Sequence, residues 1–202
     1  MKFNYHGIII MHQIIAGNNG IKIHYKENVL KGIIEAMYQS YGGMDLHPNV
    51  YEKCAILFEH IIRFHPFLDG NKRTAMLSLI FYLRTENINF ISFPSDVRFA
   101  VSIAQNCKSS HEDIKRLMEN IQRWIRFHCA RADDKNEINR IIDRNIKILE
   151  KVKEISIRRN KPDILSRSIY YWRAGEIYPD INRNYEDFIT ESYKLKESVD
   201  KI

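Results

Sequence analysis

Glycine and proline are scarce in this chain, at 8 and 5 of 202 residues. Folds built mainly from β-sheets need many tight turns, and these two residues supply much of the turn geometry. Hydrophobic residues make up 45% of the chain and charged residues 28%, which is typical of a folded protein and too apolar for a disordered one. The composition therefore favours an all-α fold.

Cysteine is also rare. Cys54, Cys107 and Cys129 lie far apart, and no two cysteines form a CxxC pair. An odd number of widely spaced cysteines indicates neither a disulfide framework nor a zinc site. Cysteines used as small apolar residues are typical of a reducing compartment, so we expect a cytoplasmic protein.

Long hydrophobic runs are missing as well. The longest candidate, Thr74–Leu83, is about half the roughly 20 apolar residues that a membrane-spanning helix needs. The apolar residues near the N-terminus recur at helical spacing and are interrupted by His12 and Gln13. This pattern predicts an amphipathic helix and not an export signal, and we expect no membrane partner.

The net charge of +6 has no obvious focus, since no block of consecutive Lys and Arg residues stands out. A basic excess fits either nucleic acid or a ligand that carries phosphate. No recognition-helix or aromatic-platform pattern accompanies it, so nucleic acid is not the partner we expect. A non-catalytic basic helical binding module remains the alternative of another class.

Helical periodicity runs through most of the chain, and breakers such as Gly17–Gly20 separate the segments. Residues 21–26 alternate apolar and polar side chains, which predicts one short strand. Ser110 is a good N-cap for the helix that follows it. After a helix near the N-terminus, the spacing predicts helices over about 26–41, 49–64, 74–86, 111–128, 137–158, 167–178 and 185–201, with a further one opening at Pro94.

A change in composition near residues 130–135 marks the expected domain boundary, because aromatic residues thin out there and charge rises. We therefore expect a catalytic domain over residues 1–130 and a helical C-terminal extension over residues 131–202. The cluster Ile169–Trp172 in the extension is interpreted as the core of a small helical appendage.

The residues suited to chemistry are concentrated in one segment, His65–Arg73, which reads HPFLDGNKR between two apolar helices. Histidine changes its charge near neutral pH, which makes His65 the candidate general base. Asp69 supplies a carboxylate suited to Mg²⁺, an ion that proteins usually hold with one or two carboxylates and nucleotide phosphates.

The second half of the segment is suited to binding an anion. It leads into a helix N-terminus, where unpaired backbone N–H groups and a partial positive charge favour phosphate. Gly70 lets the backbone come close to a ligand, and Asn71 can donate a hydrogen bond to an oxygen. Arg73 can bind phosphate through two hydrogen bonds, while Lys72 adds a point charge.

This segment resembles the motif of the Fic/Doc (Fido) family. The family pattern is HxFx(D/E)GN(G/K)R, or HxFxDANKR in the death-on-curing (Doc) branch, and HPFLDGNKR matches every specified position of the first form. The segment Ser40–Gly43 and the helix before the motif also look like the Doc-type approach to it. Thr74–Leu77 and Phe81–Arg84 look like the buried central helix, so the resemblance covers about residues 1–128.

The resemblance implies a Fido-type helical bundle with a short β-hairpin-like flap, near Ile21–Lys26, that aligns a target polypeptide by strand addition. It implies transfer from ATP or another nucleoside triphosphate, with Mg²⁺, to a Ser, Thr or Tyr hydroxyl of a target protein. Carried over to this chain, His65 would deprotonate the hydroxyl and Asp69 would hold Mg²⁺. The phosphates would be held by Gly70, Asn71, Lys72 and Arg73.

Two positions depart from the branch that transfers AMP. Its members usually carry Gly where this chain has Lys72, and a second Arg three residues after the first, where this chain has Met76. Doc-type members have the Lys and resemble kinases that transfer the terminal phosphate. We therefore favour phosphorylation; AMP transfer (AMPylation) stays open, because Gly70 is shared with the AMP-transferring branch.

Regulation is the last point that the resemblance addresses. Many Fic proteins carry an inhibitory helix with the pattern (S/T)xxxE(G/N). In this chain no Ser or Thr is followed four residues later by Glu. Doc-type toxins are restrained by a separate antitoxin, so the resemblance implies an antitoxin protein as partner.

Overall fold

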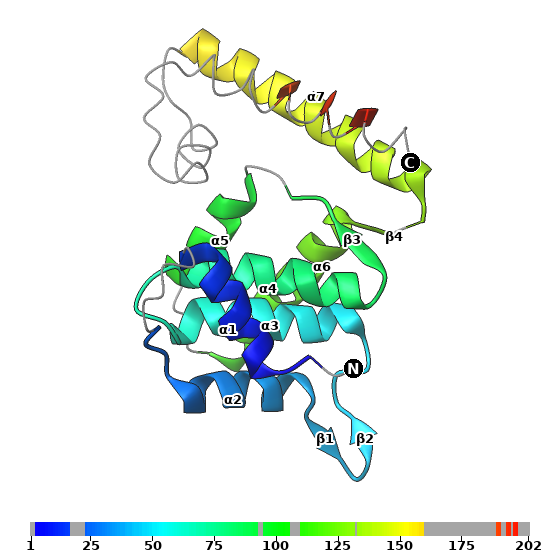
Figure 1. The fold of residues 1–202 in the computed structure, drawn as a ribbon. Helices are drawn as coiled ribbons and strands as arrows, with labels where there is room; N and C mark the ends of the chain where they lie inside the picture. The colour runs from blue at the N-terminus through cyan, green and yellow to red at the C-terminus, as the bar shows by residue number, and fades with distance from the viewer. Residues whose placement is uncertain are drawn as a thin grey trace. The chain divides into compact units, whose positions relative to one another are not determined.

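The computed structural model describes residues 3–16, 23–92, 95–105, 110–131 and 133–159, together with residues 189–190, 193–194 and 196–197. These residues form seven helices and a few short strands, which confirms the predicted all-α fold (Figure 1). The predicted helix over 167–178 and the Ile169–Trp172 cluster lie outside the described residues, as does most of the helix predicted over 185–201. No helix in the described ranges is long and apolar enough to cross a membrane.

Contacts between residues divide the chain into two units. The first unit is Met1–Phe90 with Ile103–Phe127, and the second is Ile91–Ser102 with His128–Ile202. The motif segment at residues 65–73 therefore lies wholly within the first unit.

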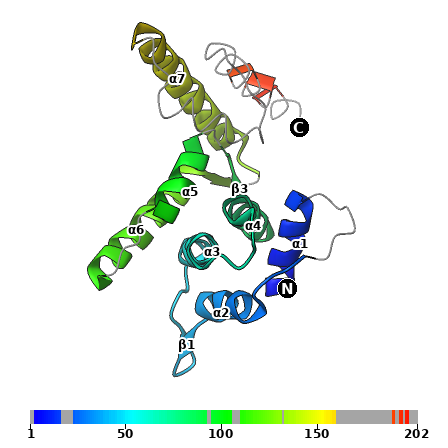
Figure 2. The ribbon, with the colours of Figure 1, turned by 90° about the vertical axis from the view of Figure 1, so that its left-hand side faces the viewer.

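Two adjacent helices form the centre of the first unit: α3 (Val50–Phe64) and α4 (Asn71–Thr85). Helix α2 (Glu27–Met37) packs against α3, and α1 (Tyr5–Ala16) packs against α4, as the view down these helices shows (Figure 2). The helices enclose a core of side chains that are less than 2% exposed: Ile8, Leu30, Ile33, Met37, Leu57, Phe58, Ile61, Ile62, Leu79, Leu83 and Ile121.

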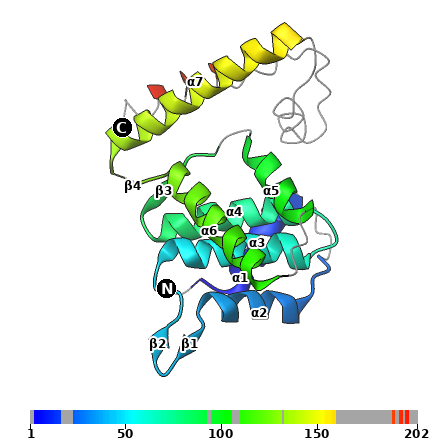
Figure 3. The same ribbon diagram turned by 180° about the vertical axis from the view of Figure 1, so that it is seen from behind.

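Helix α6 (His111–His128) crosses the other face of the central pair, as the view from behind shows (Figure 3). Trp124 on α6 stacks on Phe58 of α3, with 5.1 Å between the ring centroids. The predicted cap of α6 is confirmed, because the Asp113 N–H donates to Ser110 Oγ at 3.1 Å. The side chain satisfies a backbone donor that has no partner within the helix.

Helix α2 ends earlier than the sequence predicted, at Met37 and not near Tyr41. The chain instead forms an antiparallel hairpin of β1 (Ser40–Tyr41) and β2 (Met44–Asp45). Its turn is Gly42–Gly43, and both glycines have positive φ, +58° and +82°. Two consecutive positive φ values suit the tight hairpin turn that glycine pairs favour, so a pair expected to stop a helix also reverses the chain.

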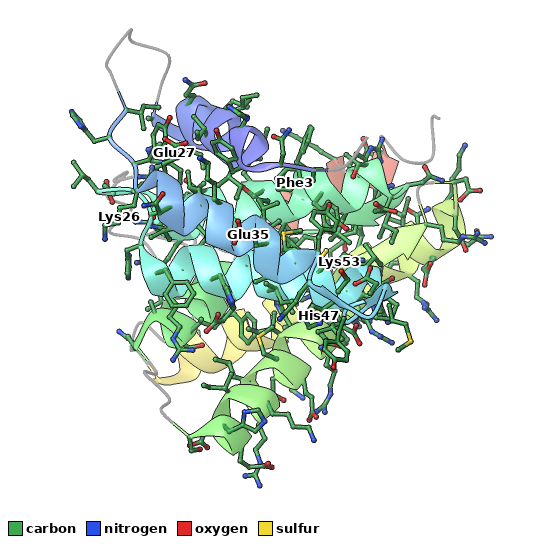
Figure 4. The ribbon with its side chains drawn as sticks, turned by 90° about the horizontal axis from the view of Figure 1, so that it is seen from below. Phe3, Lys26, Glu27, Glu35, His47 and Lys53 are labelled. Carbon is green, nitrogen blue, oxygen red and sulfur yellow. The ribbon has the colours of Figure 1, made fainter. Side chains whose placement is uncertain are left out.

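The hairpin lies far from the motif. It precedes the start of α3, and the motif follows the end of this 15-residue helix, which is about 22 Å long at 1.5 Å per residue. Figure 4 shows the same separation, with His47 and Lys53 near the hairpin and Lys26 at the opposite end of α2. This hairpin is therefore not in the segment near Ile21–Lys26 where the resemblance places a flap.

The second unit contains the long helix α7 (Lys135–Arg159) and the strand β4 (Cys129–Arg131). Helix α5 (Ser95–Gln105) begins in this unit. Strand β3 (Ile88–Phe90) ends at the last residue before the segment Ile91–Ser102 of this unit. The core residues Ile91 and Ala130 pack with four isoleucines of one α7 face, Ile138, Ile141, Ile142 and Ile146. These isoleucines follow an i, i+3, i+4, i+8 pattern, which is typical of the buried face of an amphipathic helix.

Candidate active site

The motif segment contains a loop and the first turn of a helix. His65–Gly70 joins α3 to α4, and residues 71–73 are already helical, so α4 begins three residues earlier than predicted. Both ends of the loop are left-handed: His65 has φ 46° and ψ 64°, and Gly70 has φ 72° and ψ 5°. A left-handed residue that is not glycine is uncommon and often marks a functional position. The His65 side chain is exposed at the end of α3.

The side chain of Asn71 fixes the shape of this loop. Its Nδ2 donates to the Phe67 carbonyl at 2.8 Å, and its Oδ1 accepts from the Phe67 N–H at 3.0 Å. Asn71 and Phe67 are 6% and 3% exposed. The Asn71 amide is therefore engaged with the loop itself through its Oδ1 and one N–H of its Nδ2.

The segment before α2 pairs with the same loop. The Lys26 N–H donates to the Pro66 carbonyl at 2.9 Å, and Tyr25 forms an isolated antiparallel bridge with Phe67. In the predicted strand at 21–26, residues 23–26 are described and carry this single bridge, while Ile21 and Lys22 lie outside the described residues. Extended backbone thus lies directly beside the motif, where the flap was expected.

The N-terminus of α4 presents the groups that the sequence suggests for binding an anion. The first intrahelical bond runs from the Thr74 N–H to the Gly70 carbonyl at 2.8 Å, so the N–H groups of residues 71–73 precede the helical ladder. Lys72 and Arg73 are exposed in this first turn. Their charges add to the partial positive charge of the helix end, an arrangement that favours phosphate.

Asp69 lies beside this turn, with its Oδ2 3.7 Å from Arg73 Nη2. The two side chains are 95% and 56% exposed, so the pair is weakly held and the carboxylate is accessible. Within the described part of the chain, no three His, Cys, Asp or Glu side chains form a cluster that could hold a metal ion. A single accessible carboxylate beside a cationic helix end has the chemistry that suits Mg²⁺, an ion usually held by one or two carboxylates together with phosphates and water.

The two departures from the AMP-transferring pattern occupy different environments. Lys72 is exposed at the anion-binding end, while Met76, one turn further along α4, is buried at 6% exposure. The position where the other branch has a second arginine is therefore part of the hydrophobic core in this protein.

The structure brings together the six residues that the sequence singled out: His65, Asp69, Gly70, Asn71, Lys72 and Arg73. It adds one residue that in the sequence is seen only as an interruption of an apolar stretch, His12 on α1. The His12 ring is buried against Phe67 and Thr74. A signal existed, because His12 lies beside Met11 on the face of α1 that turns to the core.

Comparison with known proteins finds one family whose model matches part of the chain. The model of the Fic/DOC family matches residues 2–83, about two fifths of the chain, which is a shorter range than the resemblance over residues 1–128. The match runs from α1 to near the end of α4 and includes the entire motif. No curated protein and no solved structure matches the chain. The matched range, which is similar to the Fic/DOC family, lies within the first unit.

Proposed function

We propose that residues 65–73 are the active centre of a Fic/Doc-type transferase, which moves part of a nucleoside triphosphate onto a hydroxyl of a target protein. The observation that carries this proposal is the meeting of three groups within one loop and one helical turn. A histidine, an accessible carboxylate and a cationic helix N-terminus lie together in the segment that the Fic/DOC family model matches.

In this mechanism His65 accepts the proton of a Ser, Thr or Tyr hydroxyl as the hydroxyl oxygen attacks phosphorus, and the bond from that phosphorus to the bridging oxygen of the nucleotide breaks. Transfer of the terminal phosphate of ATP releases ADP, and transfer of AMP would release pyrophosphate. Mg²⁺, when bound, neutralises part of the phosphate charge, and Asp69 is the residue that would hold it. The N–H groups of residues 71–73, with Lys72 and Arg73, hold the phosphates in line. The reaction needs positioning and charge stabilisation above all, which is what a rigid loop on a helix end provides.

The transferred group is the finer part of the proposal, and we favour the terminal phosphate. Lys72 extends from the first turn of α4, where a glycine would leave the anion site open. The buried Met76 removes the second arginine that AMP-transferring members place one turn later. Both features support Doc-type phosphorylation, with AMP transfer by the same site as the alternative.

Transfer from labelled ATP tests this proposal. The protein is incubated in a cell lysate with Mg²⁺ and ATP labelled at either the α or the γ phosphate. Label from γ alone supports phosphorylation, and label from α identifies AMP transfer. His65→Ala should abolish labelling, while His111→Ala, an exposed histidine on α6, should leave it unchanged. Absence of any transfer that depends on His65 would contradict the enzyme proposal.

Partners and location follow from the same assignment. We propose that the enzyme is cytoplasmic. We also propose that a separate antitoxin protein restrains it, because this sequence lacks the (S/T)xxxE pattern of the inhibitory helix. Expression should then arrest growth of the host cell in a manner that His65→Ala relieves. For the rival reading as a basic binding module, a salt-sensitive gel shift with duplex DNA that His65→Ala leaves unchanged would be the expected result.

A further inference from the structure

We propose that His12 is a positioning residue of this active site, and that its ring holds the motif loop in place by packing against it from α1. The proposal depends on the function proposed above for the loop, since it assigns to α1 the task of holding the phosphate-binding turn in shape. His12 is 53 residues from His65 in the sequence and comes from a different helix.

The first contact is a stack. The His12 ring lies parallel to the Phe67 ring, with 3.8 Å between the centroids and 7° between the planes. Both residues are buried, at 8% and 3% exposure. The backbone of Phe67 is already held by Asn71 and by the bridge to Tyr25, so His12 holds the side chain of a residue whose main chain is fixed.

The second contact is polar. His12 Nδ1 lies 2.9 Å from Thr74 Oγ1 in a buried hydrogen bond. Thr74 is fully buried, and its N–H makes the first intrahelical bond of α4, to Gly70. One ring therefore links the middle of the loop, through Phe67, to the helix turn that follows the loop, through Thr74.

The third contact lies under Gly70. A Cβ placed on Gly70 would stand 3.4 Å from His12 Cε1 and 3.7 Å from Ile15 Cγ2. The side of Gly70 on which a side chain would project is thus covered by α1. The backbone of this turn is proposed to bind the phosphates. Because His12 packs against the turn, the turn cannot move towards the core.

The chemistry of the ring suits this role. Burial lowers the pKa of His12, the nearby Arg73 lowers it further, and Asp69 acts in the opposite direction. An uncharged imidazole can stack on an aromatic ring and still make one hydrogen bond. Phenylalanine at this position would keep only the stack on Phe67. Asparagine would keep only a polar atom near the Nδ1 position, which can bond to Thr74. These two variants therefore separate the stacking contact from the hydrogen bond.

The test compares His12→Phe, His12→Asn and His12→Ala with the wild type and with Gln13→Ala, the exposed neighbour on α1. We expect His12→Ala to lower kcat/KM for ATP by about 10–100-fold, because small misplacements of an active site have effects of this size. The KM for the target protein should stay unchanged. His12→Phe and His12→Asn should each lower kcat/KM for ATP by less than His12→Ala does, and Gln13→Ala should behave like the wild type.

A second measurement does not need activity. The Phe67 N–H is bonded to Asn71 Oδ1, so its hydrogen exchange reports the shape of the loop. We expect this exchange to quicken at least about tenfold in His12→Ala and to be unchanged in Gln13→Ala. Thr74→Val should add little to His12→Phe, because both variants remove the same hydrogen bond.

The outcomes separate the two proposals. A wild type that transfers no label contradicts the proposed function, while the exchange of the Phe67 N–H still tests the role of His12. Unchanged exchange in His12→Ala, or a loss of activity no larger than its loss of folded protein, would overturn the positioning role. Equal losses in His12→Ala and Gln13→Ala would overturn it as well.

Discussion

The side-chain amide of Asn71 and the backbone of Phe67 form a closed pair of hydrogen bonds, at 2.8 and 3.0 Å. Asn71 is the first residue of α4, and Phe67 lies in the loop before it. The loop is therefore bent back onto the helix end that follows it. A buried pair of this kind fixes backbone groups that would otherwise lack partners away from water.

Asn71→Ala should destabilise the protein by about 1–3 kcal/mol, because it leaves the buried N–H and C=O of Phe67 without partners. Urea unfolding of the variant and the wild type measures this difference. Asn120→Ala, at an exposed position of α6, is the matched control and should change the free energy of unfolding by less than about 0.5 kcal/mol. Equal effects at the two sites would contradict the structural role of Asn71.

Replacing two glycines by alanine should shift stability in opposite directions. Gly70 has φ +72°, so Gly70→Ala should cost about 1–2 kcal/mol in backbone strain. Gly32 lies exposed within α2 with nothing within 4 Å of an added Cβ, so Gly32→Ala should stabilise by about 0.5–1 kcal/mol. Thermal unfolding measures both, and a stabilising Gly70→Ala would show that the loop takes another conformation.

Glu59 on α3 should make stability sensitive to acid. Burial acts to raise the pKa of Glu59, but contacts with His60 Nδ1 at 2.6 Å and Arg63 Nη1 at 3.1 Å outweigh it, and the pKa lies below its usual 4.5. The folded state therefore favours the carboxylate. The stabilising contribution of the Glu59 carboxylate is complete above pH 4.5, the usual pKa. It is lost as the pH falls through the lower pKa that Glu59 has in the folded protein.

Melting temperatures of the wild type and Glu59→Gln, measured from pH 7 to pH 3, test this dependence. The difference between the two proteins should narrow as the pH falls below about 4.5. Glu119→Gln, at an exposed position of α6, should follow the wild type throughout. A Glu59→Gln difference that does not vary with pH would place its effect in packing and not in charge.

Removal of metal should stop the proposed transfer. A chelator in excess should abolish labelling, and added Mg²⁺ should restore it. Asp69→Asn should lower the rate by about 100-fold, the size typical for loss of a group that stabilises developing charge. Asp133→Asn, an exposed aspartate outside the motif, should have no effect. Transfer that is indifferent to both chelation and Asp69→Asn would remove Asp69 from the mechanism.

Much of this structure follows from local pattern. The core faces of α3 and α6 repeat apolar residues at helical spacing, and Ser110 caps α6 as predicted, because helices and caps depend on residues only a few positions apart. The motif is just as local, since nine consecutive residues carry the proposed base, the accessible carboxylate and the cationic helix turn proposed to bind phosphate. Strand pairs left little trace, because β1 and β2 are two residues each and too short for alternation to be read.

The sequence by itself thus determined the helical fold and the identity of the residues that we propose for chemistry. Only the tertiary structure decided how they are held: that the Asn71 amide faces its own loop, that Tyr25 and Lys26 pair with that loop, and that His12 lies beneath it. The hydrogen bond between His12 and Thr74 joins residues 62 positions apart. Such a contact forms only when α1 packs against α4. Helical periodicity predicts which face of a helix is buried, but it does not predict which residue of another helix that face will contact.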